Sequence, residues 1–387
     1  MPLFLDFPEP RIEQTAFTIA GWVAGDSPSV PVKVSINGRR VPHALQESPG
    51  LNAALPGFAF VRRVVSHGHV VVDCGEDVVG EIELQFGDEM VKKHVSIAPS
   101  LRDAAMREMN LREKTRAWCQ ANLQCPVCGS TGLRVAAEQV NCRFCGVRFP
   151  QGNRALDLIS PELRRRASIV DSVNVSNNPY TPLALELINK TVRKGGWVLD
   201  CGAGSRAERI ENVVNVEVVD YLSTDVLAVG EALPFADESF DAVLSLAVLE
   251  HVRDPFKCAQ ELMRVLKPGG NIIADVPFLQ PVHGYPNHFY NMTRTGLTSL
   301  FDGGGEIIAC YTPIHGHPIW AMQWFASAYL HGLPPDIREQ FGRRTLSDLA
   351  KPFGPSDLVR PEVSELNSNT IEILACLNTV VVRKHVR

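Results

Sequence analysis

Short apolar or alternating runs fill the first hundred residues, and turn residues separate them. The runs cover residues 17–23, 30–36, 58–65, 69–74, 81–86 and 91–97. Turn dipeptides such as Asn37-Gly38 and Gly87-Asp88 lie between them. Runs of this length at this spacing are typical of strands in a small antiparallel sandwich. The pattern therefore predicts a β-sandwich over residues 1–97.

A helical pattern replaces the strand pattern from Ser100 to Asn122. Ser100 is placed to cap the start of a helix, and Asp103 then lies in its first turn. Apolar positions of this segment are supplied by Leu101, Met106, Met109, Leu111 and Trp118. The sequence predicts a helical linker over residues 98–124.

Four of the ten cysteines form two C-x-x-C pairs, with thirteen residues between the pairs: Cys125, Cys128, Cys142 and Cys145. Two tight turns on facing hairpins present four sulfur ligands as a tetrahedron, which Zn²⁺ prefers. Gly129 and Gly146 follow the pairs where such a turn needs positive φ. We predict a zinc ribbon over residues 125–160 with a structural ion, because four cysteines close the site. A redox pair and an iron centre are the alternatives.

Alternating helix and strand signals begin at Pro182 and indicate an α/β domain with a mainly parallel sheet. The apolar run from Trp197 to Cys201 enters a glycine-rich turn. Gly202 and Gly204 remove side chains where a backbone must approach a ligand, and Asp200 adds an acceptor at the strand end. Glu217 follows Asp200 by seventeen residues, near the spacing expected for a carboxylate that binds a ribose diol.

Three further motifs identify a family: L-P-F-x-x-x-S-F-D at 233–241, L-E-H at 249–251 and R-V-L-K-P-G-G at 264–270. In this order and spacing, residues 177–300 resemble class I S-adenosylmethionine-dependent methyltransferases of the methyltransferase type 11 family. The resemblance implies a Rossmann-like α/β fold, which we expect over residues 161–387, and a methyl-transfer reaction.

The resemblance also assigns cofactor contacts. The methionine part of the cofactor would contact the turn formed by Asp200, Cys201, Gly202, Ala203 and Gly204. The ribose hydroxyls would bind Glu217, and the adenine would lie beside Ala232 and Leu233. Leu246 and Ala247 would face the cofactor and the substrate. Three departures stand out. The crossover between Gly204 and Val213 has room for about one helical turn, the segment between Val219 and Leu233 is similarly short, and Val229 replaces an aspartate that relatives often have near the adenine. In this compact variant we prefer Glu217 to Asp220 as the ribose ligand.

Candidate bases gather after the last parallel strand. His283 is our first choice and His288 our second, since both lie on a loop at the expected carboxyl end of the sheet. His251 is a third candidate, and an equally good interpretation makes it a packed, hydrogen-bonded histidine. Relatives that build polysaccharides carry a similar segment, often with an acidic residue near Asn287 and an arginine near Asn291, so the acceptor chemistry stays open.

The tail predicts a closing strand pair, residues 306–312 and 371–383, around a helical insertion at about 313–368. Within the insertion, residues 317–333 carry many large apolar side chains and no Asp, Glu, Lys or Arg. We expect this helix to pack against its own domain or against a second subunit, which would make a homodimer. Capping the acceptor pocket and resting on a membrane surface are the alternatives, the latter disfavoured by the missing basic residues.

Composition narrows the class of protein. The 387 residues are 45% hydrophobic and 21% charged, with a net charge of -5, which describes a folded protein of two or three domains without a general attraction to nucleic acid. No apolar run approaches the ~20 residues that cross a bilayer. The N-terminus lacks a basic signal-peptide start, so we expect a soluble, cytoplasmic protein.

Two substrate classes compete. The segments 19–23 and 32–38 resemble immunoglobulin-like accessory domains of sugar-modifying enzymes, which favours a small-molecule or glycan acceptor and O-methylation. The ribbon before the catalytic fold instead resembles certain ribosomal RNA guanine methyltransferases, and residues 125–166 hold seven arginines against three acidic residues. RNA is therefore the alternative substrate. A non-catalytic partner would need a broken glycine turn, whereas Asp200, Gly202 and Gly204 are all present.

Overall fold

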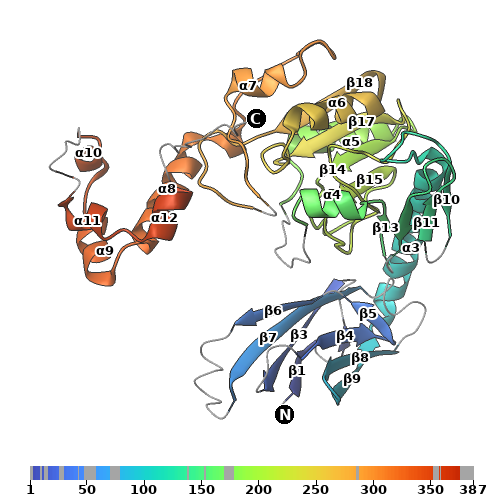
Figure 1. Ribbon diagram of the computed structural model, residues 1–387, viewed down its shortest axis with the longest axis horizontal. Helices are drawn as coiled ribbons and strands as arrows, with labels where there is room; N and C mark the ends of the chain where they lie inside the picture. Colours follow the sequence, from blue (N-terminus) through green and yellow to red (C-terminus); the bar gives the residue numbers. More distant parts are fainter. Residues whose placement is uncertain are drawn as a thin grey trace, which may run out of the picture. The chain divides into compact units, whose positions relative to one another are not determined.

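The structure, a computed structural model, divides into two compact units (Figure 1). One comprises Met1–Val248 with Val252–Asp275, and the other Leu249–His251 with Val276–Arg387. The structure describes residues 3–8, 11–12, 16–25, 30–41, 43–47, 58–69, 79–136, 139–151, 154–169, 178–284, 287–351, 357 and 359–374.

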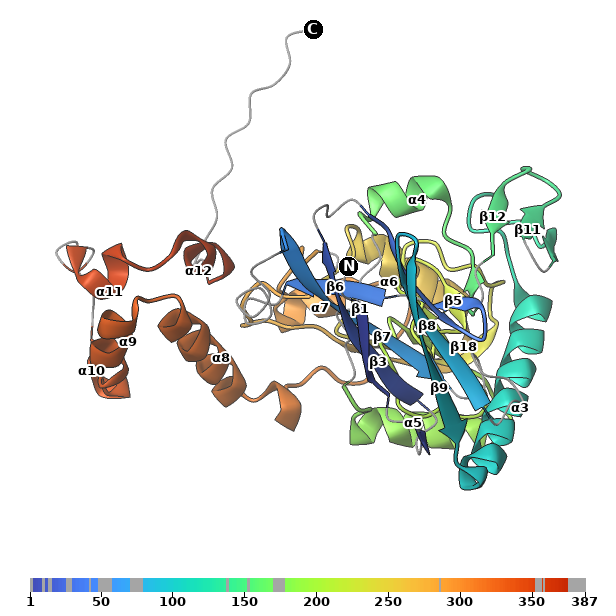
Figure 2. The same cartoon turned by 90° about the horizontal axis from the view of Figure 1, so that it is seen from below.

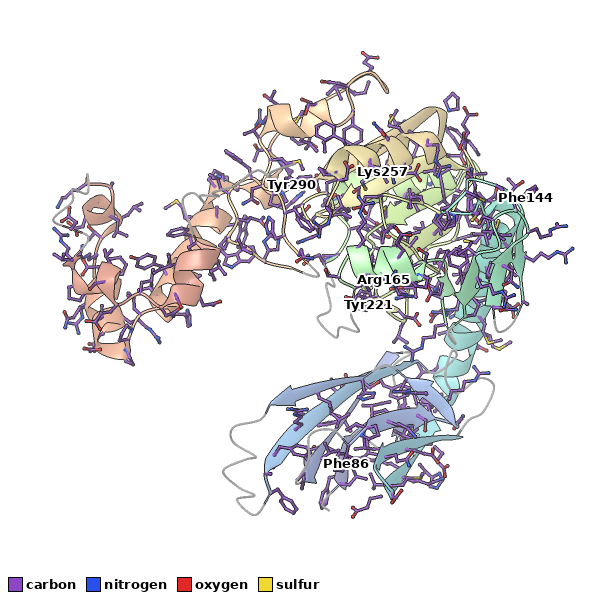
Figure 3. The ribbon with its side chains drawn as sticks, in the orientation of Figure 1. Phe86, Phe144, Arg165, Tyr221, Lys257 and Tyr290 are labelled. Atoms are coloured by element: carbon purple, nitrogen blue, oxygen red, sulfur yellow. The ribbon has the colours of Figure 1, made fainter. Side chains whose placement is uncertain are left out.

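The N-terminal region consists of two β-sheets, which confirms its predicted β-rich character. The sheet orders are β1-β3-β7-β6 and β2-β9-β8-β4-β5. The strands are β1 (Leu3–Phe7), β2 (Arg11–Ile12), β3 (Ala16–Gly25), β4 (Val32–Ile36), β5 (Arg39–Val41), β6 (His43–Glu47), β7 (Phe60–His69), β8 (Val79–Phe86) and β9 (Glu89–Ile97). Alternate residues such as Val34, Leu84 and Phe86 form the core, where Phe86 is labelled in Figure 3. Residues 70–74 of an expected strand lie outside the described residues, and the immunoglobulin-like assignment stays a prediction.

A long helix, α3 (Pro99–Asn122), follows the sandwich. It begins one residue earlier than expected: Ala98 is its N-cap, so the prediction that Ser100 caps the helix was wrong. Pro99 explains this start, because proline is favoured at the first helical position. Leu101 and Met109 pack against the sandwich core, and Trp118 stacks on Trp197 with ring centroids 4.4 Å apart. The predicted linker is therefore a packed helix.

Three short antiparallel strands carry the cysteine pairs. They are β10 (Leu133–Val135), β11 (Gln139–Cys142) and β12 (Arg148–Pro150). Phe144 lies at the tip between the second cysteine pair, 76% exposed (Figure 3). This arrangement presents the two C-x-x-C turns from one small hairpin structure.

The α/β domain contains a six-stranded sheet of order β13-β16-β15-β14-β17-β18, and every neighbouring pair is parallel. The predicted mainly parallel α/β architecture is thus confirmed. Its elements are β13 (Leu156–Asp157), α4 (Pro161–Arg166), α5 (Pro182–Val192), β14 (Val198–Cys201), β15 (Val213–Glu217), β16 (Val226–Leu227), β17 (Phe240–Leu246), α6 (Pro255–Val265) and β18 (Leu266–Asp275). The sheet takes its edge strand β13 from before residue 161, the expected start of the domain.

Helices cover this sheet as the apolar pattern requires. Ala184 and Ile188 of α5 pack on Val198 and Val213. Leu183 of the same helix is 45% exposed, because Ala184 occupies the inward position. Residues 205–212 contain bends and a turn but no helix, so the first crossover lacks the single helical turn that we expected.

The second unit is helical. It contains α7 (Arg294–Ser299), the 3-10 turn η1 (Ile314–Gly316), α8 (Pro318–His331), α9 (Pro335–Gly342), α10 (Leu346–Leu349), α11 (Pro361–Ser364) and α12 (Ser368–Ile373). Figure 2 shows α8 to α12 as separate helices, in orange to red. Among the described residues, no helix combines the length and the apolar character needed to cross a membrane.

The predicted closing strand pair was wrong in its described part. Residues 306–312 have no strand, and residues 371–373 belong to α12, while 375–383 lie outside the described residues. The side chain of Asn367 accepts a hydrogen bond from the Thr370 amide at 2.8 Å, so a capped helix covers the start of the second expected strand. Every residue of α8 is at least partly exposed, for example Trp320 at 59%. Its Trp324 ring still packs 5.0 Å from the His283 ring, centroid to centroid, and packing of the whole helix on its own domain or on a second subunit stays a prediction.

Candidate functional site

The glycine-rich turn after β14 brings the backbone into a left-handed conformation twice. Gly202 has φ of 74° and Gly204 has φ of 66°, values that other residues rarely adopt. The Gly202 and Ala203 amides donate to the Val216 carbonyl at 2.9 and 3.1 Å, which ties the turn to β15. A Cβ at Gly202 would lie 2.3 Å from Val248 Cγ2. The tight curve therefore needs glycine for both conformation and space.

Glu217 meets this turn directly. One carboxylate oxygen accepts from the Gly204 amide at 2.9 Å, and the other accepts from the Val218 amide at 2.7 Å. Burial raises the pKa of Glu217, and these amides oppose the rise. Two of about four lone-pair positions of the carboxylate remain for hydroxyl donors. The geometry suits a ribose diol beside the glycine turn.

Asp220 has different surroundings. Burial raises its pKa, while the charge of Arg154 and the amide of Ala155 lower it. These neighbours belong to the segment after the ribbon and not to the glycine turn. The structure thus connects Glu217, and not Asp220, to Gly204, in line with the choice made from the sequence, although the ribose contact itself stays a prediction.

Asp200 lies in a buried polar cluster that sequence reasoning missed. Its Oδ2 accepts from the Tyr180 hydroxyl at 2.6 Å and from the Arg206 Nε and Nη2 atoms at 3.0 and 2.8 Å. The Arg206 guanidinium lies over the Tyr180 ring, 3.8 Å from its centroid. Burial raises the pKa of Asp200, and Arg206 opposes that rise. Arg206 stands two residues after Gly204, which was the available signal for this partner.

The remaining expected cofactor contacts lie around the ends of the parallel strands. Leu233 is buried, and its amide donates to Glu261 at 2.9 Å, whereas Ala232 is half-buried. Val229 is a buried core residue, and its apolar side chain cannot accept the hydrogen bond that an aspartate at this position would accept from adenine. The side chain of Cys201 is also buried.

Ala247 follows β17 with φ of 56°, and its amide donates to the Asp275 carbonyl at 2.9 Å. A non-glycine residue held in this region stores strain, and such residues cluster at functional sites. Leu246 before it is half-buried. Both residues are therefore placed at the strand end, as the resemblance implied.

The second unit brings the three candidate bases together. The rings of His251, His283 and His288, hereafter the histidine cluster, have centroids 4.5 to 5.5 Å apart. His251 Nδ1 lies 2.7 Å from the Asn287 carbonyl, and His283 Nδ1 lies 2.7 Å from the Pro281 carbonyl. A carbonyl only accepts, so each Nδ1 carries the proton and each Nε2 keeps a lone pair in the neutral ring. Burial lowers the pKa of both histidines.

His288 is used differently. Its Nδ1 accepts the His283 amide at 3.2 Å, so the proton lies on Nε2. That Nε2 faces the Tyr290 carbonyl at 3.1 Å and Asn291 Oδ1 at 3.0 Å, both acceptors. Because both nitrogens have backbone or side-chain partners, His288 positions the loop that carries His283 and is a poorer candidate base.

The four cysteine sulfurs converge within 4.8 Å of one another. Cys125 and Cys145 sulfurs are 3.7 Å apart, and those of Cys128 and Cys142 are 3.6 Å apart. In a tetrahedron with metal–sulfur bonds of about 2.3 Å, sulfur atoms are roughly 3.8 Å apart. Gly129 and Gly146 have φ of 71° and 74°, as each turn was expected to require.

Backbone groups complete both cysteine turns. The Gly129 amide donates to the Cys125 carbonyl at 2.8 Å, and the Gly146 amide to the Cys142 carbonyl at 3.0 Å. Burial favours the neutral Cys142 thiol, but the Cys145 and Phe144 amides and Ser130 together lower its pKa to about 6. The turns are thus shaped to hold a thiolate at this position.

A parallel sheet, a glycine turn after one strand and an acidic residue on the neighbouring strand are typical of α/β domains that bind an adenosine-containing cofactor, a class that includes methyltransferases that use S-adenosylmethionine. The residues fit this cofactor: Asp200 Oδ1 is buried and has no hydrogen-bond partner among the described residues, and the Glu217 carboxylate has capacity left for hydroxyl groups.

Comparison with known proteins agrees with this class. Residues 199–274 match the family described as "Methyltransferase domain". The chain therefore carries an S-adenosylmethionine-dependent methyltransferase domain. Over 102 residues the chain is 39% identical to an uncharacterized methyltransferase of Mycobacteroides abscessus, covering 26% of this chain and 36% of the relative. Over 112 residues it is 42% identical to one of Mycobacterium tuberculosis, covering 28% and 41%.

The chain spans about a third of the length of the curated relatives it matches. Among solved structures, a methyltransferase from Thermotoga maritima is 25% identical, with 24% of this chain and 51% of that chain covered and a TM-score of 0.18. The [4+2]-cyclase SpnF is 20% identical, with 44% and 78% covered and a TM-score of 0.27. At these scores neither structure bears on the fold.

Proposed function

We propose that this protein transfers a methyl group from S-adenosylmethionine to a hydroxyl group of a small polar molecule or glycan. The contact of Glu217 with the Gly204 amide carries the cofactor part of the proposal, because it joins a ribose-binding carboxylate to the glycine turn. The rings of His251 and His283, whose pKa values burial lowers, support a hydroxyl acceptor, since such a group must lose a proton.

S-Adenosylmethionine, when bound, supplies an electrophilic methyl group on a sulfonium. Glu217 would accept hydrogen bonds from the ribose hydroxyls, and Asp200 Oδ1 would accept one from the methionine part. His283 Nε2 would take the proton of the acceptor hydroxyl while its oxygen bonds to the methyl carbon and the carbon–sulfur bond breaks. The Pro281 carbonyl holds the tautomer that this step needs.

An RNA substrate has weaker support. Two of the seven arginines in the basic stretch are engaged internally: Arg154 is 7% exposed, and Arg164 pairs with Asp157. Fewer arginines are thus left to bind phosphates than the sequence alone indicated. RNA remains as an outcome of the experiment below.

We also propose that Cys125, Cys128, Cys142 and Cys145 bind a structural Zn²⁺. The sulfur distances of 3.6 and 3.7 Å support this, being close to the edge of a zinc–thiolate tetrahedron. Four thiolates leave no open position for a substrate, so the ion would stabilise the ribbon.

The proposed activity is tested by incubating purified protein with methyl-labelled S-adenosylmethionine and host extract, then separating RNA, polysaccharide and small polar molecules. Label in the polysaccharide or small-molecule fraction is the expected result. Label in RNA would contradict the proposed acceptor and would assign substrate recognition to the ribbon.

A matched pair of variants tests the cofactor site. Glu217→Gln should weaken S-adenosylhomocysteine binding by about 10- to 100-fold, since hydrogen bonds to a charged group contribute roughly 1.5–3 kcal/mol. Asp220→Asn, a buried carboxylate with other neighbours, is the control. Equal effects of the two substitutions in calorimetry would contradict the assigned role of Glu217.

A further inference from the structure

Glu250 adds a buried carboxylate to the histidine cluster. Its side chain is fully buried, and one carboxylate oxygen lies 3.7 Å from His251 Nε2. One ligand atom each from Glu250, His251 and His283 can be chosen so that all three lie within 4.8 Å of one another. All three residues belong to the second unit.

The two imidazoles are held in the form that binds a metal. His251 Nδ1 donates to the Asn287 carbonyl, and His283 Nδ1 donates to the Pro281 carbonyl. In each ring Nε2 is therefore the nitrogen with a lone pair for a metal ion. Metal-binding histidines characteristically donate their other N–H to such a carbonyl or to a carboxylate. His288 fixes the His283 backbone through its amide, so the loop is supported as well.

Space around the cluster is also restricted. A Cβ at Gly284 would lie 2.2 Å from His251 Cε1 and 2.7 Å from its Nε2. The Trp324 ring of α8 packs 5.0 Å from His283, centroid to centroid. Glycine is therefore required where the loop passes over the His251 ring, and an aromatic side chain shields the other histidine.

We propose that Glu250, His251 and His283 form a binding site for one divalent first-row transition ion. Ligand bonds of about 2.1 Å place two ligand atoms roughly 3.0–3.4 Å apart, for octahedral and tetrahedral angles respectively. The 3.7 Å between Glu250 and His251 needs only a small closure to reach this range. Two imidazoles and one carboxylate leave open positions on the ion and favour Mn²⁺, Fe²⁺, Co²⁺ or Zn²⁺ over Ca²⁺.

The catalytic consequence rests on the proposed function, whereas ion binding does not. An acceptor hydroxyl bound at an open position of the ion is more acidic and releases its proton to water. The acceptor oxygen then bonds to the methyl carbon, and the electron pair of the broken carbon–sulfur bond stays on sulfur. His283 Nε2 in this form is a metal ligand and not the proton acceptor, which refines its role.

A Mn²⁺ titration tests the site. Protein first supplied with one equivalent of Zn²⁺ per chain, which four soft thiolates take in preference to two imidazoles and a carboxylate, is freed of unbound zinc and titrated with Mn²⁺. The paramagnetic resonance signal of free Mn²⁺ measures binding. Manganese suits this purpose because it avoids thiolate ligands. The variants are Glu250→Gln, His283→Asn and Gly284→Ala, the last of which keeps every ligand but displaces the His251 ring. His331→Gln, an exposed histidine of α8, is the control.

Wild type and His331→Gln should bind one Mn²⁺ per chain, and each of the three variants at least about 10-fold more weakly. Equal affinity of wild type and the variants, or no binding by folded wild type, would overturn the site. Far-ultraviolet circular dichroism identifies any variant that fails to fold. S-Adenosylhomocysteine binding is measured on the same samples. Wild type that binds Mn²⁺ but not S-adenosylhomocysteine would contradict the proposed function alone. Wild type that binds S-adenosylhomocysteine but not Mn²⁺ would contradict the ion site alone.

Discussion

Replacing Arg206 with Met should destabilise the catalytic sheet strongly, because it leaves the Asp200 carboxylate buried without its cation. The side chains of the pair are 9% and 0% exposed. The substitution removes two charge-assisted hydrogen bonds, at 3.0 and 2.8 Å, each contributing about 1.5–3 kcal/mol. Together the two hydrogen bonds therefore contribute about 3–6 kcal/mol. This range agrees with the loss of about 3–5 kcal/mol that follows when one partner of a buried ion pair is removed.

The loss should depend on pH. Burial raises the folded-state pKa of Asp200 above its ordinary value of about 3.9, and removing Arg206 raises it further. Between the unfolded and folded pKa values the native state binds more protons than the unfolded state, so stability falls as pH rises. The difference in the free energy of unfolding between wild type and the variant should therefore be smaller at pH 5 than at pH 8.

Urea unfolding followed by tryptophan fluorescence measures this effect, since Trp118 and Trp197 stack beside the sheet. Asp200→Asn in the Arg206→Met background removes the buried charge and should recover part of the stability. Lys114→Met is the control, since Lys114 and Glu211 form an ion pair with both side chains about half exposed, and such pairs contribute roughly 0–1 kcal/mol. A loss below 1 kcal/mol at pH 8, or one independent of pH, would refute the reasoning.

Three further predictions concern packing and metal. Gly202→Ala should cost about 1–3 kcal/mol more than Gly269→Ala in urea unfolding, because both have positive φ but only the Cβ at 202 meets Val248; equal costs would contradict the close contact. Trp118→Ala should lower the free energy of unfolding by about 3 kcal/mol, because Trp118 stacks on Trp197. Phe144→Ala should lower it by less than about 0.5 kcal/mol, because Phe144 is exposed. Cys142→Ser should abolish release of one Zn²⁺ per chain in a colorimetric chelator assay, and unchanged zinc would exclude this ligand.

The sequence was sufficient for features that depend on local pattern. The parallel strands, the glycine turn and the C-x-x-C turns follow from residues close together in the chain, and the structure places each of them as predicted. The positive φ of Gly202 and Gly129 shows the same local control. The zinc ion and the ribose contact themselves stay predictions.

Features that depend on distant partners escaped prediction. Tyr180 and Arg206 reach Asp200 from different segments, and the position of Arg206 just after the glycine turn was the one local signal for either contact. The tail was expected to hold the closing strand pair of the fold, yet the Asn367 cap starts a helix there. The different tasks of His283 and His288 depend on which nitrogen faces a carbonyl, a fact that only coordinates supply.

The edge strand β13 has a practical consequence for shortening the chain. β13 lies next to β16 at one end of the catalytic sheet, yet it follows directly after the ribbon in the sequence. A chain cut to begin at residue 178 would keep the whole matched methyltransferase segment and still expose the backbone amides and carbonyls of β16. Unprotected strand edges pair with other chains. Such a truncation should therefore aggregate, and one that starts before α3 should remain monodisperse.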